Sequence, residues 1–286
     1  MSGAVQTGYA PPAGPPPPES GDRWPRWLVA LTVAWAVLLA GLTWVSTRND
    51  PPTVREQRSL TQAAPVVDGA IGELVAAATG AVPALLPPEV DRGCRVAPFA
   101  EGATLRRQVE LAVPGGEERS VLERIADRLP PAWRAGVRVT PDGPRLRADA
   151  GEFVAVQGRQ VADGRLRLTV DTGCRRVGNG YAAAALGATG AEVGALTEAL
   201  RALGVPAAEP EALVTAPCPG GGVARTVRST AGPASASPQA ALASLAGGTP
   251  VVETPELYAY RRDRVAVLVD LYPDEMLLSA TTGCAG

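Results

Sequence analysis

The chain has 286 residues, of which 46% are hydrophobic and 20% charged, and its formal net charge is -2. These values fit a globular protein of one large or two small domains, and the near-neutral charge gives no electrostatic basis for nucleic-acid binding. The sequence contains no His and no Lys. It therefore lacks the usual general base at neutral pH, the commonest zinc ligand and any lysine for a Schiff base or phosphate loop. We assign no catalytic, cofactor-binding or metal site.

The N-terminal residues 1–26 contain the stretch APPAGPPPP, which is typical of an extended polyproline II chain. We interpret them as a Pro-rich cytoplasmic tail. Two roles are open for this tail, a solvated segment or a ligand for the aromatic groove of a cytoplasmic partner.

Residues 27–47 carry no charge and include Trp27 and Trp44 near their two ends. As a helix they would span ~31 Å, enough to cross the hydrocarbon core of a membrane. We predict a single transmembrane helix, with a cleaved signal peptide and a buried core helix as the alternatives. Residues 48–64, which include Pro51 and Pro52, are predicted to be a juxtamembrane linker.

The arginines that flank this helix on both sides do not decide its orientation by the positive-inside rule. Four cysteines without any His and without a Cys-x-x-Cys motif are a poor metal set and a plausible disulfide set, which requires an oxidising compartment. We therefore place the N-terminus in the cytoplasm and the long C-terminal part outside the cell membrane.

An internal repeat is predicted because the same pattern leads to the cysteines twice. Helix-like stretches end at Gly80 and Gly204, each before a Pro-rich passage and then a cysteine, Cys94 or Cys218. Strand pairs near the end of each half lead to the motifs DTGC and TTGC, which end at Cys174 and Cys284. The alternative is a chance similarity between two Ala-rich stretches.

The two copies are predicted as extracytoplasmic modules over residues 65–180 and 190–286. Each reads as helix, strand, strand, helix and about three strands, with EERSVLERIADRL and SPQAALASLAGG as the second helices. This order favours an α+β fold with mainly antiparallel sheets covered by helices. If each copy folds alone, the disulfides are Cys94 with Cys174 and Cys218 with Cys284.

Three groups of residues are candidates for chemistry. The glycines of CPGGGVART suggest a phosphate cradle only weakly, because no Lys-Ser/Thr ending follows, and a turn is the favoured reading. Paired carboxylates can hydrolyse glycosides, so four acids are considered: Asp171, Asp270, Asp274 and Glu275. Four arginines offer a surface for an anionic partner or, as the favoured alternative, simply solvate a sheet face: Arg134, Arg138, Arg145 and Arg147.

The sequence thus indicates a single-pass membrane protein of a bacterial cell envelope that binds or scaffolds a protein or cell-wall partner outside the membrane, without catalytic activity. A carboxylate-dependent envelope hydrolase is one alternative. A membrane sensor with a Pro-rich cytoplasmic tail is the other.

Overall fold

The computed structural model describes residues 26–49, 58–97, 100–183, 190–206, 212–233 and 237–284. The chain divides into two compact units, Met1–Thr53 and Val54–Gly286. Residues 1–25 of the predicted Pro-rich tail lie outside the described residues.

The first unit contains one helix, α1 (Arg26–Asn49), which exceeds the predicted span of 27–47 by one residue at its start and two at its end. Its window Arg26–Val45 has a mean hydropathy of 2.2, and none of it is buried inside the molecule. The Thr32 hydroxyl donates to the Leu28 carbonyl, 3.0 Å away, so this polar group is satisfied within the helix. By length and composition α1 suits a membrane anchor, and a signal sequence has the same character.

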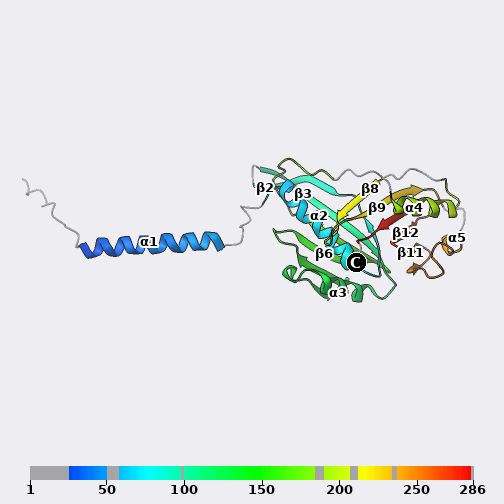
Figure 1. Ribbon diagram of the computed structural model, residues 1–286, viewed down its shortest axis with the longest axis horizontal. Coiled ribbons are helices and arrows are strands. Elements are labelled where there is room, and N and C mark those ends of the chain that lie inside the picture. Colours follow the sequence, from blue (N-terminus) through cyan, green and yellow to red (C-terminus); the bar gives the residue numbers. More distant parts are fainter. Residues whose placement is uncertain are drawn as a thin grey trace, which may run out of the picture. The chain divides into compact units, whose positions relative to one another are not determined.

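The second unit is an α+β body with helices and two antiparallel sheets (Figure 1). Its helical segments are α2 (Leu60–Ala77), α3 (Glu118–Arg128), the 3-10 turn η2 (Pro131–Trp133), α4 (Ala191–Ala202) and α5 (Pro238–Leu242). The strands of the first sheet are β1 (Val82–Leu85), β2 (Glu89–Ala97), β3 (Ala100–Ala112), β4 (Gly136–Thr140), β5 (Gly143–Asp149), β6 (Ala155–Ala162) and β7 (Arg165–Asp171). Those of the second are β8 (Ala212–Pro217), β9 (Val223–Ala231), β10 (Val252–Glu253), β11 (Leu257–Arg262), β12 (Val265–Leu271) and β13 (Met276–Thr282).

Helix α2 begins at Leu60, inside the segment 48–64 that was predicted to be a linker. Ser59 and Gln62 form a capping box, because the Ser59 hydroxyl accepts from the Gln62 amide and the Gln62 side chain accepts from the Ser59 amide. Helix α5 is shorter than the predicted helix over SPQAALASLAGG. Turns follow α5 up to Gly247 and Gly248. Their φ angles of 66° and 89° are positive, so a right-handed helix cannot continue through them.

The two sheets share one strand order. In the first sheet β3 pairs on one edge with β2 and β1, and on the other with β7, which continues to β6, β5 and β4. In the second the order is β8-β9-β13-β12-β11-β10. Each sheet carries helices on one face: α2 and α3 pack on Leu146, Leu166 and Leu168, whereas α4 and α5 pack on strands β11, β12 and β13. Helix α2 also contacts the second sheet. Val214 and Ala216 of β8 and Ala224 of β9 are buried in the same apolar cluster as the residues of α2.

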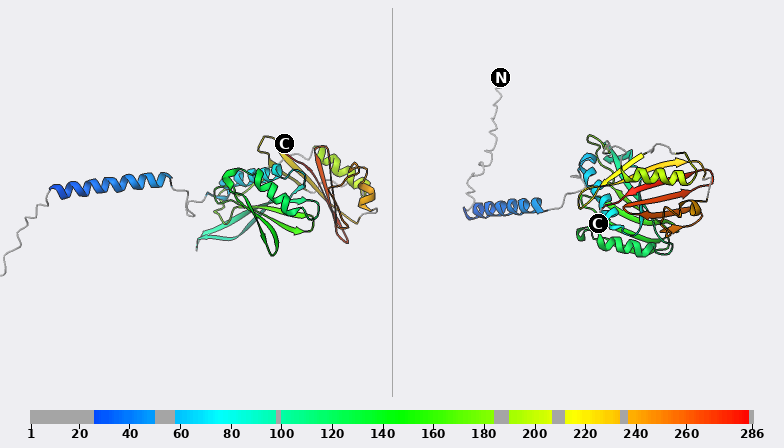
Figure 2. Two further views of the ribbon diagram at one scale, coloured as in Figure 1. Left: turned by 90° about the horizontal axis from the view of Figure 1, so that it is seen from below. Right: turned by 45° about the vertical axis from the view of Figure 1, so that its right-hand side comes forward.

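The two sheets also pack directly on each other (Figure 2). Strand β1 lies across the second sheet, and an apolar cluster joins them: Val82, Ala112, Val252, Leu257, Ala259, Ala266 and Leu268. The Leu85 amide donates to the Thr226 hydroxyl, 3.1 Å away. The segments predicted as separate modules, 65–180 and 190–286, therefore share buried surface within one compact unit.

Each half of this unit contains one disulfide. Cys94 in β2 bonds to Cys174, which follows β7, with the two Cα atoms 5.9 Å apart. Cys218 follows β8 and bonds to Cys284, which follows β13, with a Cα separation of 5.6 Å. These are the two pairs that the internal repeat predicts, and each links corresponding strands of its sheet.

Candidate functional site

The four candidate carboxylates do not meet in one site. Asp270 lies in β12 with its side chain 2% exposed and pairs with Arg165 of β7. Asp171, at the other end of β7, lies six residues from Arg165, which at the rise of a strand is ~20 Å. Asp274 and Glu275 are exposed in the turn between β12 and β13. A pair of carboxylates facing one substrate, as glycoside hydrolysis requires, is not formed by these four residues.

The burial of Asp270 changes the pKa of its carboxyl group. Desolvation raises the pKa of its carboxyl group, and the guanidinium of Arg165 opposes that shift. This pair joins the two sheets, so its role is structural. In the described part of the chain no group of three or more His, Cys, Asp or Glu residues is placed to hold a metal ion.

The glycines of CPGGGVART form the turn between β8 and β9. Gly221 and Gly222 have φ angles of 94° and 80°, and the Cys218 amide donates to the Gly222 carbonyl, 3.1 Å away. The prediction of a turn is confirmed. The turn leads into a strand, so the helix N-terminus that would hold a phosphate is not part of it.

The four candidate arginines line one concave surface on the hairpin of β4 and β5, which encloses a pocket of about 580 Å³. Its lining consists of Arg134, Gly136, Val137, Arg138, Thr140, Arg145 and Arg147. Alternate residues of a strand point to opposite faces, and Leu146, between Arg145 and Arg147, is buried under the helices. The arginines therefore occupy the outer face of the sheet, away from α2 and α3.

The strand register extends this surface over four strands. Arg138 of β4 stands opposite Arg145 of β5, which stands opposite Arg159 of β6. Arg159 in turn stands opposite Arg167 of β7. Residues directly opposite one another share a face of the sheet, so Arg138, Arg145, Arg159 and Arg167 form one line across the strands, here called the arginine row.

The arginine row is only partly neutralised. Asp142 lies 3.0 Å from Arg145, and Glu110 of β3 accepts from the Nε of Arg167 at 3.1 Å. Within the described residues no carboxylate forms an ion pair with Arg138 or Arg159. Like charges directly opposite each other destabilise a sheet, so we expect this arrangement to cost stability.

Arg134 adds a second sign of local strain at the same surface. It caps the turn η2 with φ of 48° and ψ of 43°, a left-handed conformation that is unfavourable for a residue with a side chain. Arg134 and Arg147 both line the concave surface.

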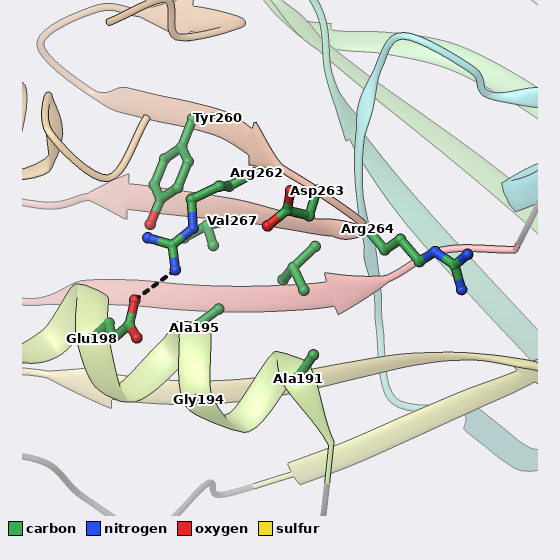
Figure 3. Close-up of a pocket in the computed structure, with 10 residues that line it drawn as sticks. Ala191, Gly194, Ala195, Glu198, Tyr260, Arg262, Asp263, Arg264 and Val267 are labelled. Atoms are coloured by element: carbon green, nitrogen blue, oxygen red, sulfur yellow. Dashed lines mark hydrogen bonds and ion pairs between the residues drawn. The ribbon is translucent and has the colours of Figure 1, made fainter. Parts of the chain in front are cut away.

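A second pocket of about 400 Å³ lies between α4 and the hairpin of β11 and β12 (Figure 3). Ala191, Gly194 and Ala195 form the helix side, and Val265 and Val267 lie on the strand side. Glu198 and Arg262 form an ion pair of 3.1 Å across it, while Arg264 points away from that pair. Burial raises the pKa of Tyr260 to about 12, so this phenol stays protonated at neutral pH. Glu198 and Arg262 are thus paired with each other, whereas Asp263 and Arg264, which also line the pocket, form no ion pair within the described residues. None of these four residues was among the predicted candidates.

Two buried arginines hold segments together. Arg175 is 1% exposed and donates to the carbonyls of Thr172, Arg58 and Glu152, and burial lowers its pKa. Arg107 is 3% exposed and bonds to Asp68 of α2 and to the Thr215 carbonyl of β8, which ties the two halves. The three hydrogen bonds of Arg175 give it a structural role, whereas the buried Nε of Arg107 has no hydrogen-bond partner among the described residues.

Comparison with models of protein families finds no match for this chain, and a search of curated proteins finds no match either. Arg159 and Arg167 were not among the predicted candidates, because only the strand register shows that they continue the line of Arg138 and Arg145.

Proposed function

We propose that this chain is a membrane-anchored binding or scaffold protein of a bacterial cell envelope, whose first sheet presents its outer face to an anionic partner. The observation that carries the proposal is the arginine row, four cations in register on four neighbouring strands. An arginine is charged at every physiological pH, and its planar group binds oxyanions through two parallel hydrogen bonds.

Two features support the location. The two disulfides are typical of a protein in an oxidising compartment. Helix α1 is apolar and long enough to anchor the chain with its Pro-rich tail in the cytoplasm and the second unit outside. Protease added to intact spheroplasts should then digest the second unit, and complete protection would contradict this orientation.

We further propose that the second unit arose by duplication of one module. The shared strand order and the matching positions of the two disulfides support this origin. Binding is favoured over catalysis because Asp270 is buried in an ion pair, Asp171 lies at the far end of β7, and Asp274 and Glu275 are exposed in a turn. The hydrolase alternative therefore has no paired site among these four residues.

The test uses the full-length protein in nanodiscs of zwitterionic lipid and beads coated with dextran sulfate, a generic polyanion. The native protein should be retained at low salt and released as salt screens the charges. A variant with Arg138, Arg145 and Arg159 all changed to Gln should lose retention. A matched variant with Arg119, Arg124 and Arg201 changed to Gln removes the same charge from exposed helix positions and should be retained. Equal retention of the two variants would refute the proposal.

A further inference from the structure

We propose that the arginine row binds a linear polymer of phosphate groups that lies across strands β4 to β7. This inference rests on the proposed function, because it names the class of anion that the outer face of the first sheet recognises. The polymer would run perpendicular to the strands, along the line from Arg138 to Arg167.

The spacing of the row suits a chain of repeated charges. Neighbouring strands lie ~5 Å apart, so the three intervals from β4 to β7 span ~14 Å. Arg147 follows Arg145 by two residues on the same face, which places it ~7 Å along β5 and widens the cationic surface. A single small anion would contact at most two of these side chains, whereas a chain contacts all of them in succession.

Exposure also favours a polymer over an isolated anion. Even the paired members of the row are open to water, with the Arg145 and Arg167 side chains 37% and 33% exposed. Ion pairs at such sites are each worth only ~0–1 kcal/mol. Useful affinity therefore requires several contacts made by one molecule, because the first contact makes the later ones intramolecular.

The arrangement of the arginines favours phosphate over carboxylate. A carboxylate holds its two oxygens in one plane and matches a single guanidinium fork. Each interior phosphate of a chain keeps two non-bridging oxygens, which diverge from a tetrahedral phosphorus atom, so one phosphate can accept from arginines of two neighbouring strands. Arg145 and Arg159, directly opposite each other, are such a pair.

The members of the row have different roles in this binding. Asp142 and Glu110 hold the Arg145 and Arg167 side chains in place before the ligand arrives. Arg138 and Arg159 have no carboxylate partner among the described residues, so their hydrogen-bond donors are available to the ligand. Arg159 stands between two arginines, and we expect binding to be most sensitive to its replacement.

The test measures binding of long-chain polyphosphate to the full-length protein in zwitterionic nanodiscs. Arg159→Gln should weaken binding by roughly tenfold, as the loss of charge-assisted hydrogen bonds predicts, and Arg159→Lys by roughly threefold, because the charge stays and the fork is lost. Arg201→Gln, an exposed arginine of α4, serves as the matched control and should leave binding unchanged. Polygalacturonate, a carboxylate polymer, should bind at least about tenfold more weakly than polyphosphate at equal charge.

The outcomes separate the two proposals. If polygalacturonate binds as tightly as polyphosphate and Arg159→Gln weakens both, the phosphate inference fails and the anion-binding function stands. If vesicles of phosphatidylglycerol bind as well as polyphosphate at equal phosphate, the ligand is a lipid surface and the polymer inference fails. If Arg159→Gln behaves as Arg201→Gln does with every anion, both proposals fail.

Discussion

The outer faces of the two sheets differ although their strands follow the same order. When Cys174 is laid on Cys284, Arg167 of β7 falls on Leu277 of β13. In the second sheet Leu277 stands opposite Asp270 of β12, and Asp270 stands opposite Leu257 of β11. None of these three paired residues is an arginine. In the first sheet this face is open to water at β5 and β6, whereas in the second it is buried under β1. The two outer faces therefore carry different side chains because one is exposed to water and the other is covered by β1, although the strand order is the same.

The charge of the two halves follows from this difference. Residues 66–178 contain 16 Arg and 15 acidic residues, and residues 190–286 contain 6 Arg and 10 acidic residues. A face buried in an apolar cluster has no place for unpaired cations, because each would lose its hydration. Only a pair such as Arg165 and Asp270 is retained there.

The largest effect is expected from removing the disulfides. Cys94 and Cys174 are 80 residues apart, and Cys218 and Cys284 are 66 apart, so the chain-entropy model gives about 4 to 5 kcal/mol for each. The second pair also packs on the core around α2, whereas β2 around Cys94 is mostly exposed. Chemical denaturation of the two double Cys→Ser variants should therefore show a larger loss of unfolding free energy for Cys218 and Cys284. A larger loss of unfolding free energy for the variant without Cys94 and Cys174 would contradict this difference between the two halves.

The next largest effect is expected in helix α2, which packs on both sheets. A Cβ atom at Gly72 of α2 would lie 1.7 Å from the carbonyl oxygen of Pro217 in β8, so the helix and the second sheet would have to move apart. Gly72→Ala should cost about 3 kcal/mol or more of unfolding free energy. Gly69→Ala, three residues earlier in α2 with open space around it, should instead stabilise by about 0.5 to 1 kcal/mol. Equal thermal stability of the two variants would show that α2 does not touch the second sheet.

The ion pair between the sheets should give a smaller and pH-dependent loss. Arg165→Ala leaves the Asp270 carboxylate buried without its partner, at a cost of about 2 to 3 kcal/mol near neutral pH. Burial already raises the pKa of Asp270 and Arg165 opposes it, so the variant's pKa rises further. A raised pKa in the folded state means that stability is lost as pH rises through it, so the deficit should shrink in acid. Thermal unfolding of both proteins at several pH values checks this, and a deficit independent of pH would exclude Asp270 as its cause.

The smallest effect has the opposite sign. Arg159→Glu places a carboxylate between Arg145 and Arg167, which relieves two like-charge contacts. The variant should gain a few tenths to about 1 kcal/mol of unfolding free energy at low salt, and the gain should vanish in high salt. A stability gain together with a loss of anion binding would show that the row is kept for its ligand. A destabilised variant would mean that Arg159 has a structural partner.

The sequence predicted the features that depend on local patterns. The strand pairs before DTGC and TTGC correspond to β6 with β7 and to β12 with β13, and the helix predicted over EERSVLERIADRL corresponds to α3. The repeated Thr-Gly-Cys motif paired the cysteines. Strand β1 was not predicted, because Pro83 lies in a Pro-rich passage and all four residues of the strand are buried, so no alternation of polar and apolar residues indicates it. Pro is tolerated there because β1 pairs with β3 alone.

The site was predicted in part for a similar reason. Arg134, Arg138, Arg145 and Arg147 are close in sequence and were recognised as one group. Arg159 and Arg167 joined them only through strand register, which depends on pairing between distant residues. The packing of the two sheets also escaped prediction, because it depends on contacts such as Arg165 with Asp270, 105 residues apart.

The most direct measurement is a hydrogen-exchange footprint of the full-length protein in zwitterionic nanodiscs, with and without polyphosphate. Binding across the arginine row should slow amide exchange in β4, β5 and β6, whose outer face carries Arg138, Arg145 and Arg159, and leave β11, β12 and β13 unchanged. Protection confined to the second sheet, or to the pocket beside α4, would contradict the assignment of the first sheet as the binding surface.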